Sequence, residues 1–410
     1  MMDVLKALAH PSEVWSLLRF KYGGGKETVM PPLDLSGMTP SLKRCYELLN
    51  ATSRSFAAVI QALDNQLRDA VCIFYLVLRA LDTVEDDMTI PVEEKVPLLQ
   101  GFYTNLYDPT WSCSESKEKD NAVLEEFPTI TEEFRRLEIV YQDIIADITK
   151  KMGSGMCVFL EKDVGSLAEW DEYCHYVAGL VGIGLSRIFA ASGLEDSVVG
   201  KDQVLANSMG LFLQKTNIIR DYLEDIVQGR KFWPKEAWGQ YASSLEELQY
   251  PQNQTSALAC LNLLITNALG HVADQLLYMS RLRNQSIFNF CAIPQVMAMA
   301  TLVLCYNNLR VFSGVVKIRR GQAVALMMAC TTMSDLKAIT YHLAQELLTK
   351  ICPQAPLAEE TRKKACEIMM LCSDSPKCQS APVRATPNLY PIVGAAAIVA
   401  VATYAAVQTV

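Results

Sequence analysis

The sequence VCIFYLVLRALDTVED at residues 71–86 is an apolar run that ends in carboxylates, and MGLFLQKTNIIRDYLED at residues 209–225 repeats that arrangement. Both runs carry their carboxylates at positions i, i+3 and i+4: Asp82, Glu85 and Asp86 in the first acidic pattern, and Asp221, Glu224 and Asp225 in the second. In an α-helix these positions share one face, so each pattern points its charges in one direction. The apolar flanks predict two buried helices whose acidic faces meet inside a helical core.

Carboxylates that crowd one buried face repel each other and need cations beside them. A divalent cation such as Mg²⁺ takes oxygen ligands, keeps several waters and is usually completed by the phosphates of a substrate. Arg79 and Arg220 also lie beside the two patterns on otherwise apolar stretches. Both signs of charge therefore converge in a core, which is typical of functional sites. The residues favour a diphosphate site with bound Mg²⁺, and the alternative is a pair of acidic stripes that face solvent.

Composition limits the class of protein. The 410 residues are 50% hydrophobic with a mean hydropathy of +0.14, so the chain can bury one large core or two ordinary ones. Its net charge is -8 and it has no long basic run, which argues against nucleic acid as the main partner. The cysteines form no CxxC motif, which predicts free thiols in a reducing compartment. The histidines belong to no HExxH or triad motif, which argues against serine hydrolases and zinc enzymes.

Helical periodicity dominates from Leu42 to Lys350 and strand-like alternation is nearly absent, so the sequence predicts an all-α fold around one core. One long helix is expected from near Glu132 to Leu160. The uncharged stretch 285–309 contains Asn289 and Pro294, and we interpret it as a buried core helix. A membrane-spanning segment is the alternative for that stretch.

The glycines of the stretch Gly179–Gly184 follow no strand, so they are not a dinucleotide-binding motif. Because glycine inside a helix costs about 1 kcal/mol relative to alanine, these residues predict a kink or a close approach of backbone to ligand.

The C-terminal end differs from the rest of the chain. No charge occurs from Ala385 to Val410, which is long enough to span a bilayer as one helix, and a tail helix docked on the protein is the alternative. The expected organisation is an N-terminal segment at 1–40, an all-α domain at 41–350, a polar linker at 351–384 and a transmembrane anchor at 385–410.

Several segments in the same order resemble squalene synthases, the farnesyl-diphosphate farnesyltransferases, and the animal form above all. The resemblance extends from about Leu17 to Lys350. The segments that carry it are Arg54–Phe56, Tyr75–Asp87, Tyr173–Gly179, Leu213–Asp225 and Val316–Gln322.

This resemblance implies a single-domain isoprenoid-synthase fold and a reaction in two steps that requires Mg²⁺ and NADPH. Two molecules of farnesyl diphosphate would condense to presqualene diphosphate, and that intermediate would be rearranged and reduced to squalene, which commits carbon to sterol biosynthesis. We expect a monomer on the endoplasmic reticulum membrane, anchored at its C-terminus, with the catalytic domain in the cytosol.

The resemblance also assigns roles to residues. Both acidic patterns would hold Mg²⁺, and the departing diphosphate would be bound by Arg54, Arg79, Arg220 and Arg230. The substrate pocket would be lined by Ser53, Phe56, Tyr75, Gln214 and Asn217. Phe290 would shield the carbocation, and Lys317 and Arg319 would bind the phosphates of NADPH. Tyr173 would accept the proton lost in the first step, but a phenol with a pKa near 10 is a poor base, so the diphosphate can assist or replace it.

Two other interpretations fit part of the sequence. A phytoene- or dehydrosqualene-type synthase shares the acidic patterns but performs no reduction, and the basic segment Lys317–Arg320 and the tail disfavour it. A membrane-tethered binding scaffold without activity is disfavoured because the acidic and arginine sets are intact.

Overall fold

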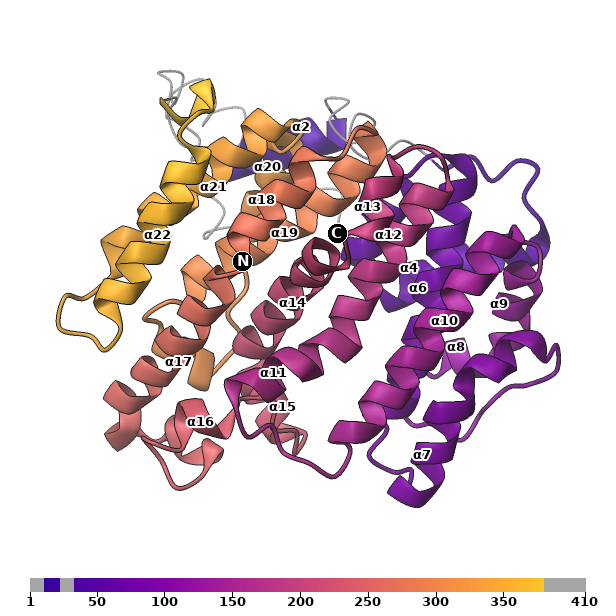
Figure 1. Ribbon diagram of the computed structural model, residues 1–410, viewed down its shortest axis with the longest axis horizontal. Helices are drawn as coiled ribbons and strands as arrows, with labels where there is room; N and C mark the ends of the chain where they lie inside the picture. Colours follow the sequence, from indigo (N-terminus) through magenta and orange to yellow (C-terminus); the bar gives the residue numbers. More distant parts are fainter. Residues whose placement is uncertain (1–10, 23–32, 380–410) are drawn as a thin grey trace, which may run out of the picture.

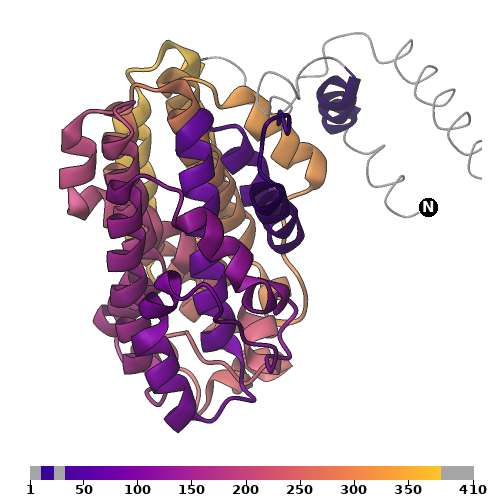
Figure 2. The ribbon, with the colours of Figure 1, turned by 90° about the vertical axis from the view of Figure 1, so that its right-hand side faces the viewer.

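The computed structural model describes residues 11–22 and 33–379. The described chain is built from helices without a strand, which confirms the all-α prediction. Figure 1 shows long helices side by side, with α14 near the middle, α4, α6, α9 and α10 on one side and α17, α21 and α22 on the other. Figure 2 shows the same bundle after a quarter turn, with the N-terminal helix α2 at its rim.

The first half of the described chain contains α-helices and two short 3-10 helices, η1 and η2. They are α2 (Pro11–Tyr22), α4 (Pro40–Thr52), α5 (Arg54–Gln61), α6 (Asn65–Asp86), α7 (Val92–Gly101), η1 (Phe102–Tyr107), α8 (Ala122–Glu125), α9 (Phe127–Phe134), α10 (Ile139–Met156), η2 (Cys157–Phe159) and α11 (Leu167–Cys174).

The second half begins with a π-helical turn, η3, and continues with α-helices and four 3-10 helices, η4 to η7. They are η3 (His175–Gly179), α12 (Leu180–Ala191), α13 (Ser197–Lys201), α14 (Gln203–Arg220), α15 (Tyr222–Val227), α16 (Lys235–Trp238), η4 (Leu245–Gln249), η5 (Pro251–Asn253), α17 (Gln254–Leu269), α18 (Val272–Ser280), α19 (Gln285–Cys305), η6 (Leu309–Phe312), α20 (Arg320–Ala329), α21 (Met333–Lys350), α22 (Ala358–Cys372) and η7 (Pro376–Gln379).

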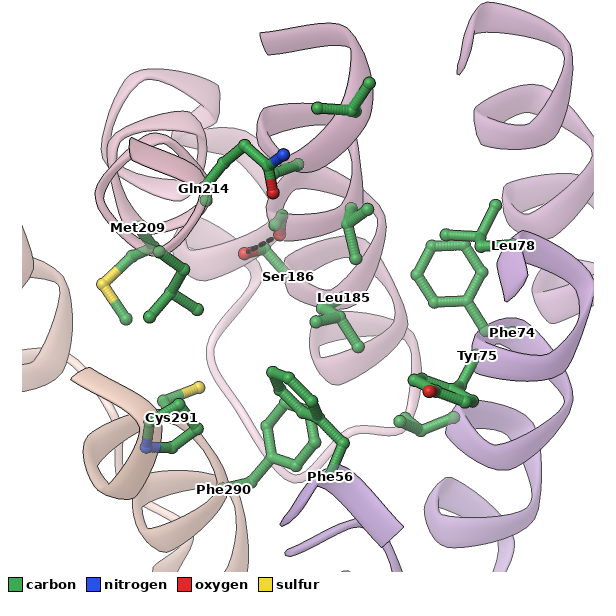
Figure 3. A pocket seen from close by; sticks show the side chains of 18 of the residues that line it. Phe56, Phe74, Tyr75, Leu78, Leu185, Ser186, Met209, Gln214, Phe290 and Cys291 are labelled. Carbon is green, nitrogen blue, oxygen red and sulfur yellow. Dashed lines mark hydrogen bonds between the residues drawn. The ribbon is translucent and has the colours of Figure 1, made fainter. Parts of the chain in front are cut away.

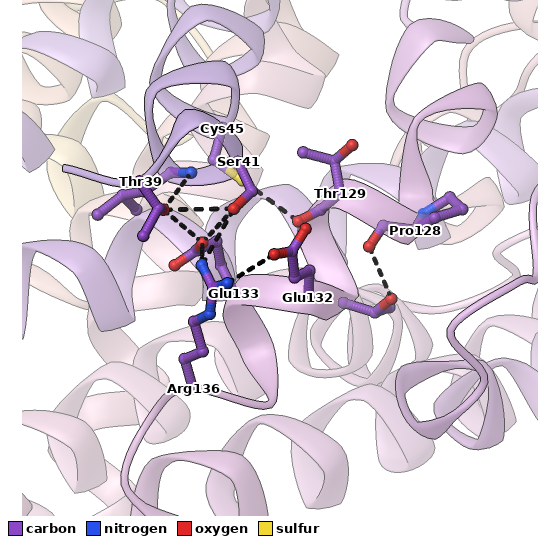
Figure 4. A network of polar contacts seen from close by, with 10 residues as sticks. Thr39, Ser41, Cys45, Pro128, Thr129, Glu132, Glu133 and Arg136 are labelled. Carbon is purple, nitrogen blue, oxygen red and sulfur yellow. Dashed lines mark hydrogen bonds and ion pairs between the residues drawn. The ribbon is translucent and has the colours of Figure 1, made fainter.

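Helix starts follow the expected capping chemistry. Thr39 caps α4 by accepting the backbone N–H of Leu42 at 3.0 Å. The Glu133 carboxylate on α9 then accepts from the hydroxyls of Thr39 and Ser41 and forms an ion pair with Arg136 (Figure 4). Because Glu133 is nearly buried, this network fixes the N-terminus of α4 against α9.

The centre of the core is α14, which packs against α12, α17, α18 and α19. By length and hydropathy alone, the stretches Leu167–Ala191, Pro251–Ser280 and Gln285–Cys305 could each cross a membrane. In the last of them, 72% of the most apolar window is buried inside the protein. The interpretation of this stretch as a core helix is therefore confirmed, although the helix ends at Cys305.

Glycines allow α14 to touch α12 and the π-helical turn η3 that precedes α12. A Cβ added to Gly182 would lie 2.3 Å from the carbonyl oxygen of Ala206, and one added to Gly210 would lie 2.2 Å from that of Ala178. Both separations are far inside van der Waals contact, so only glycine fits. The predicted close approach of backbone therefore occurs between helices, and the chain before α12 also takes a π-helical turn at His175–Gly179.

The structure differs from the sequence prediction at helix boundaries on either side of the central helices. The helix expected from Glu132 to Leu160 is interrupted after α9, where the Gln142 amide binds the carbonyls of Arg135 and Leu137 that the break leaves exposed. Within the segment 351–384 predicted as a linker, α22 packs against α21 through buried residues that include Ala365 and Ile368. The anchor predicted at 385–410 lies outside the described residues.

The prediction of free thiols is confirmed, because every cysteine is unpaired in the structure.

We predict that Gly210→Ala lowers the free energy of unfolding by about 1–3 kcal/mol, because the new methyl group must push α14 away from the backbone of Ala178 in η3. Chemical denaturation followed by circular dichroism measures this change. Gly101→Ala is the matched control, since nothing lies within 4 Å of a Cβ at that position. Equal stability of the two variants would contradict the proposed contact.

Candidate active site

A cavity of about 250 Å³ lies between α5, α6, α12, α14 and α19. Figure 3 shows its walls, with Phe74 and Tyr75 facing Met209 and Gln214 across the opening and Phe56 and Phe290 closing one side. Among the residues predicted for the site, the lining includes Phe56, Tyr75, Arg79, Asp82, Gln214, Asn217 and Phe290.

The chemistry of the lining changes along two helices. On α6 the wall runs from Phe74 to Arg79 and Asp82, and on α14 it runs from Met209 to Asn217. Both helices thus contribute apolar side chains first and polar ones toward their C-terminal ends. The cavity can hold a hydrocarbon chain in one part and a charged group in another.

The first acidic pattern occupies the last turn of α6, as predicted. About 31% of the Asp82 side chain is exposed, and Asp82 lines the cavity, so it is enclosed by protein yet open to a ligand. Burial raises the pKa of Asp82 to about 7, although Arg79 at 4.0 Å opposes that shift. Burial and the neighbouring Asp86 raise the pKa of Glu85 to about 8. The ionised carboxylates therefore need another cation.

The second acidic pattern does not lie on one continuous helix. The helix α14 ends at Arg220, and Asp221 sits between α14 and α15. The hydrogen bond from Asp225 N–H to the Asp221 carbonyl, 2.9 Å long, preserves the helical spacing across the break. Arg220 forms an ion pair with Asp221, and Glu224 is exposed rather than buried. Burial raises the pKa of Asp225 to about 7 despite the nearby Arg230.

Arg230 joins the two patterns. Its guanidinium forms ion pairs with Asp86 on α6 and with Asp225 on α15, the latter at 3.1 Å. The two acidic faces therefore meet, as the sequence predicted. The Nε atoms of Arg230 and Arg79 are buried without a hydrogen-bond partner in the structure. Two unpartnered guanidinium N–H groups beside carboxylates suit an anionic ligand that carries oxygen acceptors.

The carboxylates of the two acidic patterns are the candidate ligands for a metal ion. Within residues 11–22 and 33–379, no group of three or more His, Cys, Asp or Glu side chains is placed to hold a metal ion by itself. Carboxylate oxygens with open positions nonetheless suit Mg²⁺, which keeps waters and takes phosphate oxygens as further ligands. The donor set fits a metal that binds together with a phosphate-bearing ligand.

Tyr173 is buried between aromatic rings. Its ring stacks on Phe232 with 5.0 Å between centroids and meets Phe159 edge-on at 5.4 Å. Burial, and then the charges of Glu85 and Asp86, raise the pKa of Tyr173 well above its ordinary value. The phenol is therefore neutral and a weak base.

Sequence reasoning missed several neighbours of the acidic patterns. Phe232 also lies under the guanidinium of Arg230, with its centroid 5.6 Å away, and Asp120 lies 3.9 Å from Arg79. The buried Lys95 donates to the carbonyl of Glu85 at 2.7 Å. The adjacency of Phe232 to Arg230 could have indicated a role, whereas the others reach the site from separate segments.

Other predicted residues lie away from the cavity lining. Ser53 caps α5 by accepting the Phe56 N–H at 3.1 Å, and the Arg54 side chain lies outside the described residues. Lys317 and Arg319 are exposed in the chain before α20. There Arg319 donates from Nε and Nη2 to the Glu13 carboxylate on α2 at 2.6–3.0 Å.

The chain is similar to known proteins over most of its length. The family model of squalene/phytoene synthases matches residues 49–322. The chain is 60% identical to human squalene synthase over 378 residues, covering 92% of this chain and 90% of that protein, and 59% identical to the mouse squalene synthase over the same lengths. It is also similar to a solved structure of TcSQS in complex with the ligand BPH1237, with a TM-score of 0.80 and 44% identity over 82% of this chain and 100% of that one.

We predict that Arg230→Gln weakens the binding of inorganic diphosphate in the presence of Mg²⁺ by about 10- to 100-fold, because a hydrogen bond to a charged group contributes about 1.5–3 kcal/mol. Isothermal titration calorimetry measures the affinity. Arg281→Gln is the control, since Arg281 is ion-paired to Asp202 away from the cavity. An unchanged affinity for Arg230→Gln, or an equal loss in both variants, would refute the role of Arg230.

Proposed function

The chain belongs to the squalene/phytoene synthase family, and on that premise we propose that it is an enzyme with squalene synthase activity. It joins two molecules of farnesyl diphosphate to presqualene diphosphate and then converts that intermediate to squalene with NADPH as reductant. The observation that carries this proposal is an apolar cavity whose wall includes Arg79 and Asp82 of the first acidic pattern, while Arg230 joins that pattern to the second one.

In the first step, a C–O bond of one farnesyl diphosphate breaks and the diphosphate leaves with the electron pair. Bound Mg²⁺ would neutralise the charge that develops on the diphosphate, held by Asp82, Glu85 and Asp86 on one side and Asp221, Glu224 and Asp225 on the other. The guanidinium groups of Arg79, Arg220 and Arg230 supply further positive charge, and their fork geometry suits phosphate oxygens. Arg54 is proposed to assist from the start of α5.

The apolar part of the cavity protects the allylic cation. Phe56, Tyr75 and Phe290 line it, and the phenyl rings of Phe56 and Phe290 have no heteroatom that could capture the cation. Aromatic faces also attract a cation by about 0.5–2 kcal/mol. The amides of Gln214 and Asn217 mark the transition between the hydrocarbon part and the charged part of the wall.

The proton lost when the cyclopropane forms needs an acceptor. The raised pKa of Tyr173 makes its phenol a poor free base. We therefore propose that the departing diphosphate is the final acceptor of the proton. Tyr173 can relay the proton only if its phenol gives its own proton to the diphosphate while it accepts the proton from the substrate. Its stacking on Phe232, which also contacts Arg230, keeps the phenol near the charged groups.

The second step requires a reductant. NADPH would deliver hydride to the rearranged cation, and Lys317 and Arg319 are the proposed contacts for its phosphates. We also propose that residues 385–410 anchor the enzyme in the endoplasmic reticulum membrane, that the catalytic domain faces the cytosol and that the enzyme works as a monomer. A bilayer next to the site would take up the apolar product.

Product analysis tests the proposed activity. Purified protein lacking residues 385–410 is incubated with farnesyl diphosphate and Mg²⁺, with and without NADPH. Squalene with NADPH, and presqualene diphosphate or dehydrosqualene without it, is the expected result. A non-reduced C30 or C40 product under both conditions would assign the enzyme to the carotenoid-type branch, and no product at all would reject the activity.

We predict that Asp82→Asn and Asp221→Asn each nearly abolish both steps, because each removes a charge that the bound cations require. Rates of both half-reactions and the thermal unfolding midpoint are measured together. Asp143→Asn is the control, since Asp143 is exposed on α10. A variant at Asp82 or Asp221 that keeps more than about a tenth of the rate would contradict the metal assignment.

We predict that Lys317→Ala and Arg319→Ala leave the first step intact and cause presqualene diphosphate to accumulate. The substitution Glu13→Gln should act in the opposite direction, because the ion pair between Glu13 and Arg319 competes with the binding of NADPH phosphates to Arg319. An exposed ion pair contributes about 0.2–1 kcal/mol. The KM for NADPH should fall by about two- to fivefold in Glu13→Gln.

Steady-state kinetics with NADPH as the varied substrate measures these effects, and Lys363→Ala on the exposed side of α22 is the control. Equal loss of both steps in Lys317→Ala and Arg319→Ala would argue against a role in cofactor binding.

A further inference from the structure

Lys215 is a buried cation on the helix that forms one wall of the cavity. It lies between Gln214 and Asn217, which both line the cavity, but its own side chain does not line it. Only 1% of that side chain is exposed. A buried ammonium group persists only where its donors are satisfied, so its partners show what it holds together.

The ammonium of Lys215 contacts three other segments. It forms an ion pair with Asp171 on α11 at 2.5 Å and lies 4.9 Å from the ring centroid of Trp170 on the same helix. It donates hydrogen bonds to Asn267 Oδ1 at 2.6 Å near the end of α17 and to His271 Nε2 at 3.0 Å before α18. One side chain therefore links α14 to α11, α17 and α18.

The imidazole of His271 closes this network. Because Nε2 accepts a hydrogen bond from the ammonium of Lys215, Nδ1 carries the proton and donates to Ser208 Oγ at 2.8 Å. Burial, and then Lys215, lower the pKa of His271 to about 4, so the ring is neutral as this arrangement requires. Lys215 and Ser208 lie about two turns apart on α14, so one ring fixes that helix at two points.

The helices that Lys215 links both carry residues of the site. Tyr173 follows Asp171 by two positions on α11, while α14 presents Gln214 and Asn217 and leads directly into Asp221. We propose that Lys215 is a positioning residue that sets α14 against α11, and thereby sets the distance between Tyr173 and the second acidic pattern. The role of this distance in catalysis rests on the proposed function.

Lys95 provides an independent parallel. Among the residues that the structure describes, Lys95 and Lys215 are the buried lysines. Lys95 binds the carbonyl of Glu85 at the end of α6, so it holds the first acidic pattern as Lys215 holds the helix before the second. Each helix that leads to an acidic pattern is thus held by a lysine ammonium group that does not line the cavity.

The test compares Lys215→Met with the wild-type enzyme and with Lys337→Met as control. Lys337 on α21 is ion-paired to Asp374, which precedes η7, and neither residue lines the cavity. In Lys215→Met, displacement of the site residues should lower kcat by about 10- to 100-fold, with a smaller change in KM for farnesyl diphosphate. It should also let water capture more of the allylic cation, in which the water oxygen bonds to carbon and releases a proton, giving farnesol.

The ratio of farnesol to presqualene diphosphate distinguishes a positioning role of Lys215 from a role in the stability of the fold alone. Loss of folded enzyme lowers both products together and leaves the ratio unchanged, whereas a displaced wall raises it. A raised ratio in Lys215→Met, with Lys337→Met like wild type, supports the proposal. A ratio equal to that of wild type overturns it.

A second variant covers the case in which Lys215→Met does not fold. About 48% of the Asp171 side chain is exposed, so Asp171→Asn removes the ion pair with little change in packing, and Lys215 keeps its hydrogen bonds to Asn267 and His271. It should raise the ratio in the same direction by a smaller factor, and no change would also overturn the proposal. Wild-type enzyme that forms neither squalene nor presqualene diphosphate would reject the proposed function instead.

Discussion

The repulsion among carboxylates at the ends of two apolar helices is the constraint on which the rest of the structure depends. The end of α6 and the junction of α14 and α15 bring their negative charges to one place, where burial first, and the neighbouring carboxylates to a smaller extent, raise the pKa values of Asp82 and Asp225. Arg230 relieves part of it by pairing with carboxylates from both patterns. The remaining charge favours cations that arrive together with a phosphate-bearing substrate.

Close packing between helices brings these charges together. The contacts of α14 with α12 and with the preceding turn η3 depend on glycines, since Gly182 and Gly210 leave no room for a methyl group. Both residues also belong to the cavity wall. The same small residues that join the helices therefore shape the chamber, and a change in packing at this contact changes the space offered to a substrate.

The division of the cavity into apolar and charged parts follows from helix direction. Because α6 and α14 both become polar toward their C-terminal ends, a prenyl chain and its diphosphate can each find a matching environment. The buried Tyr173 lies beside the charged part, stacked on Phe232, and its raised pKa argues for a neutral phenol there. The proposed function would therefore place ionisation of the substrate and protection of the resulting cation in adjoining regions of one chamber.

The sequence alone predicted the helical fold, the two acidic patterns, their arginines and the buried stretch at 285–309, because helical periodicity and charge in an apolar context are local signals. The tertiary structure decided which distant segments meet. The pairing of Arg230 with Asp86, the contacts of Lys215 and the ion pair between Glu13 and Arg319 join segments far apart in the chain.

The break at Asp221 and the docking of α22 were also beyond local reasoning. Propensity describes a helix in isolation, whereas packing against neighbours determines where that helix ends and what it covers. The residues proposed to do the chemistry were therefore visible in the sequence, but the side chains that hold them in place became visible only in the folded structure.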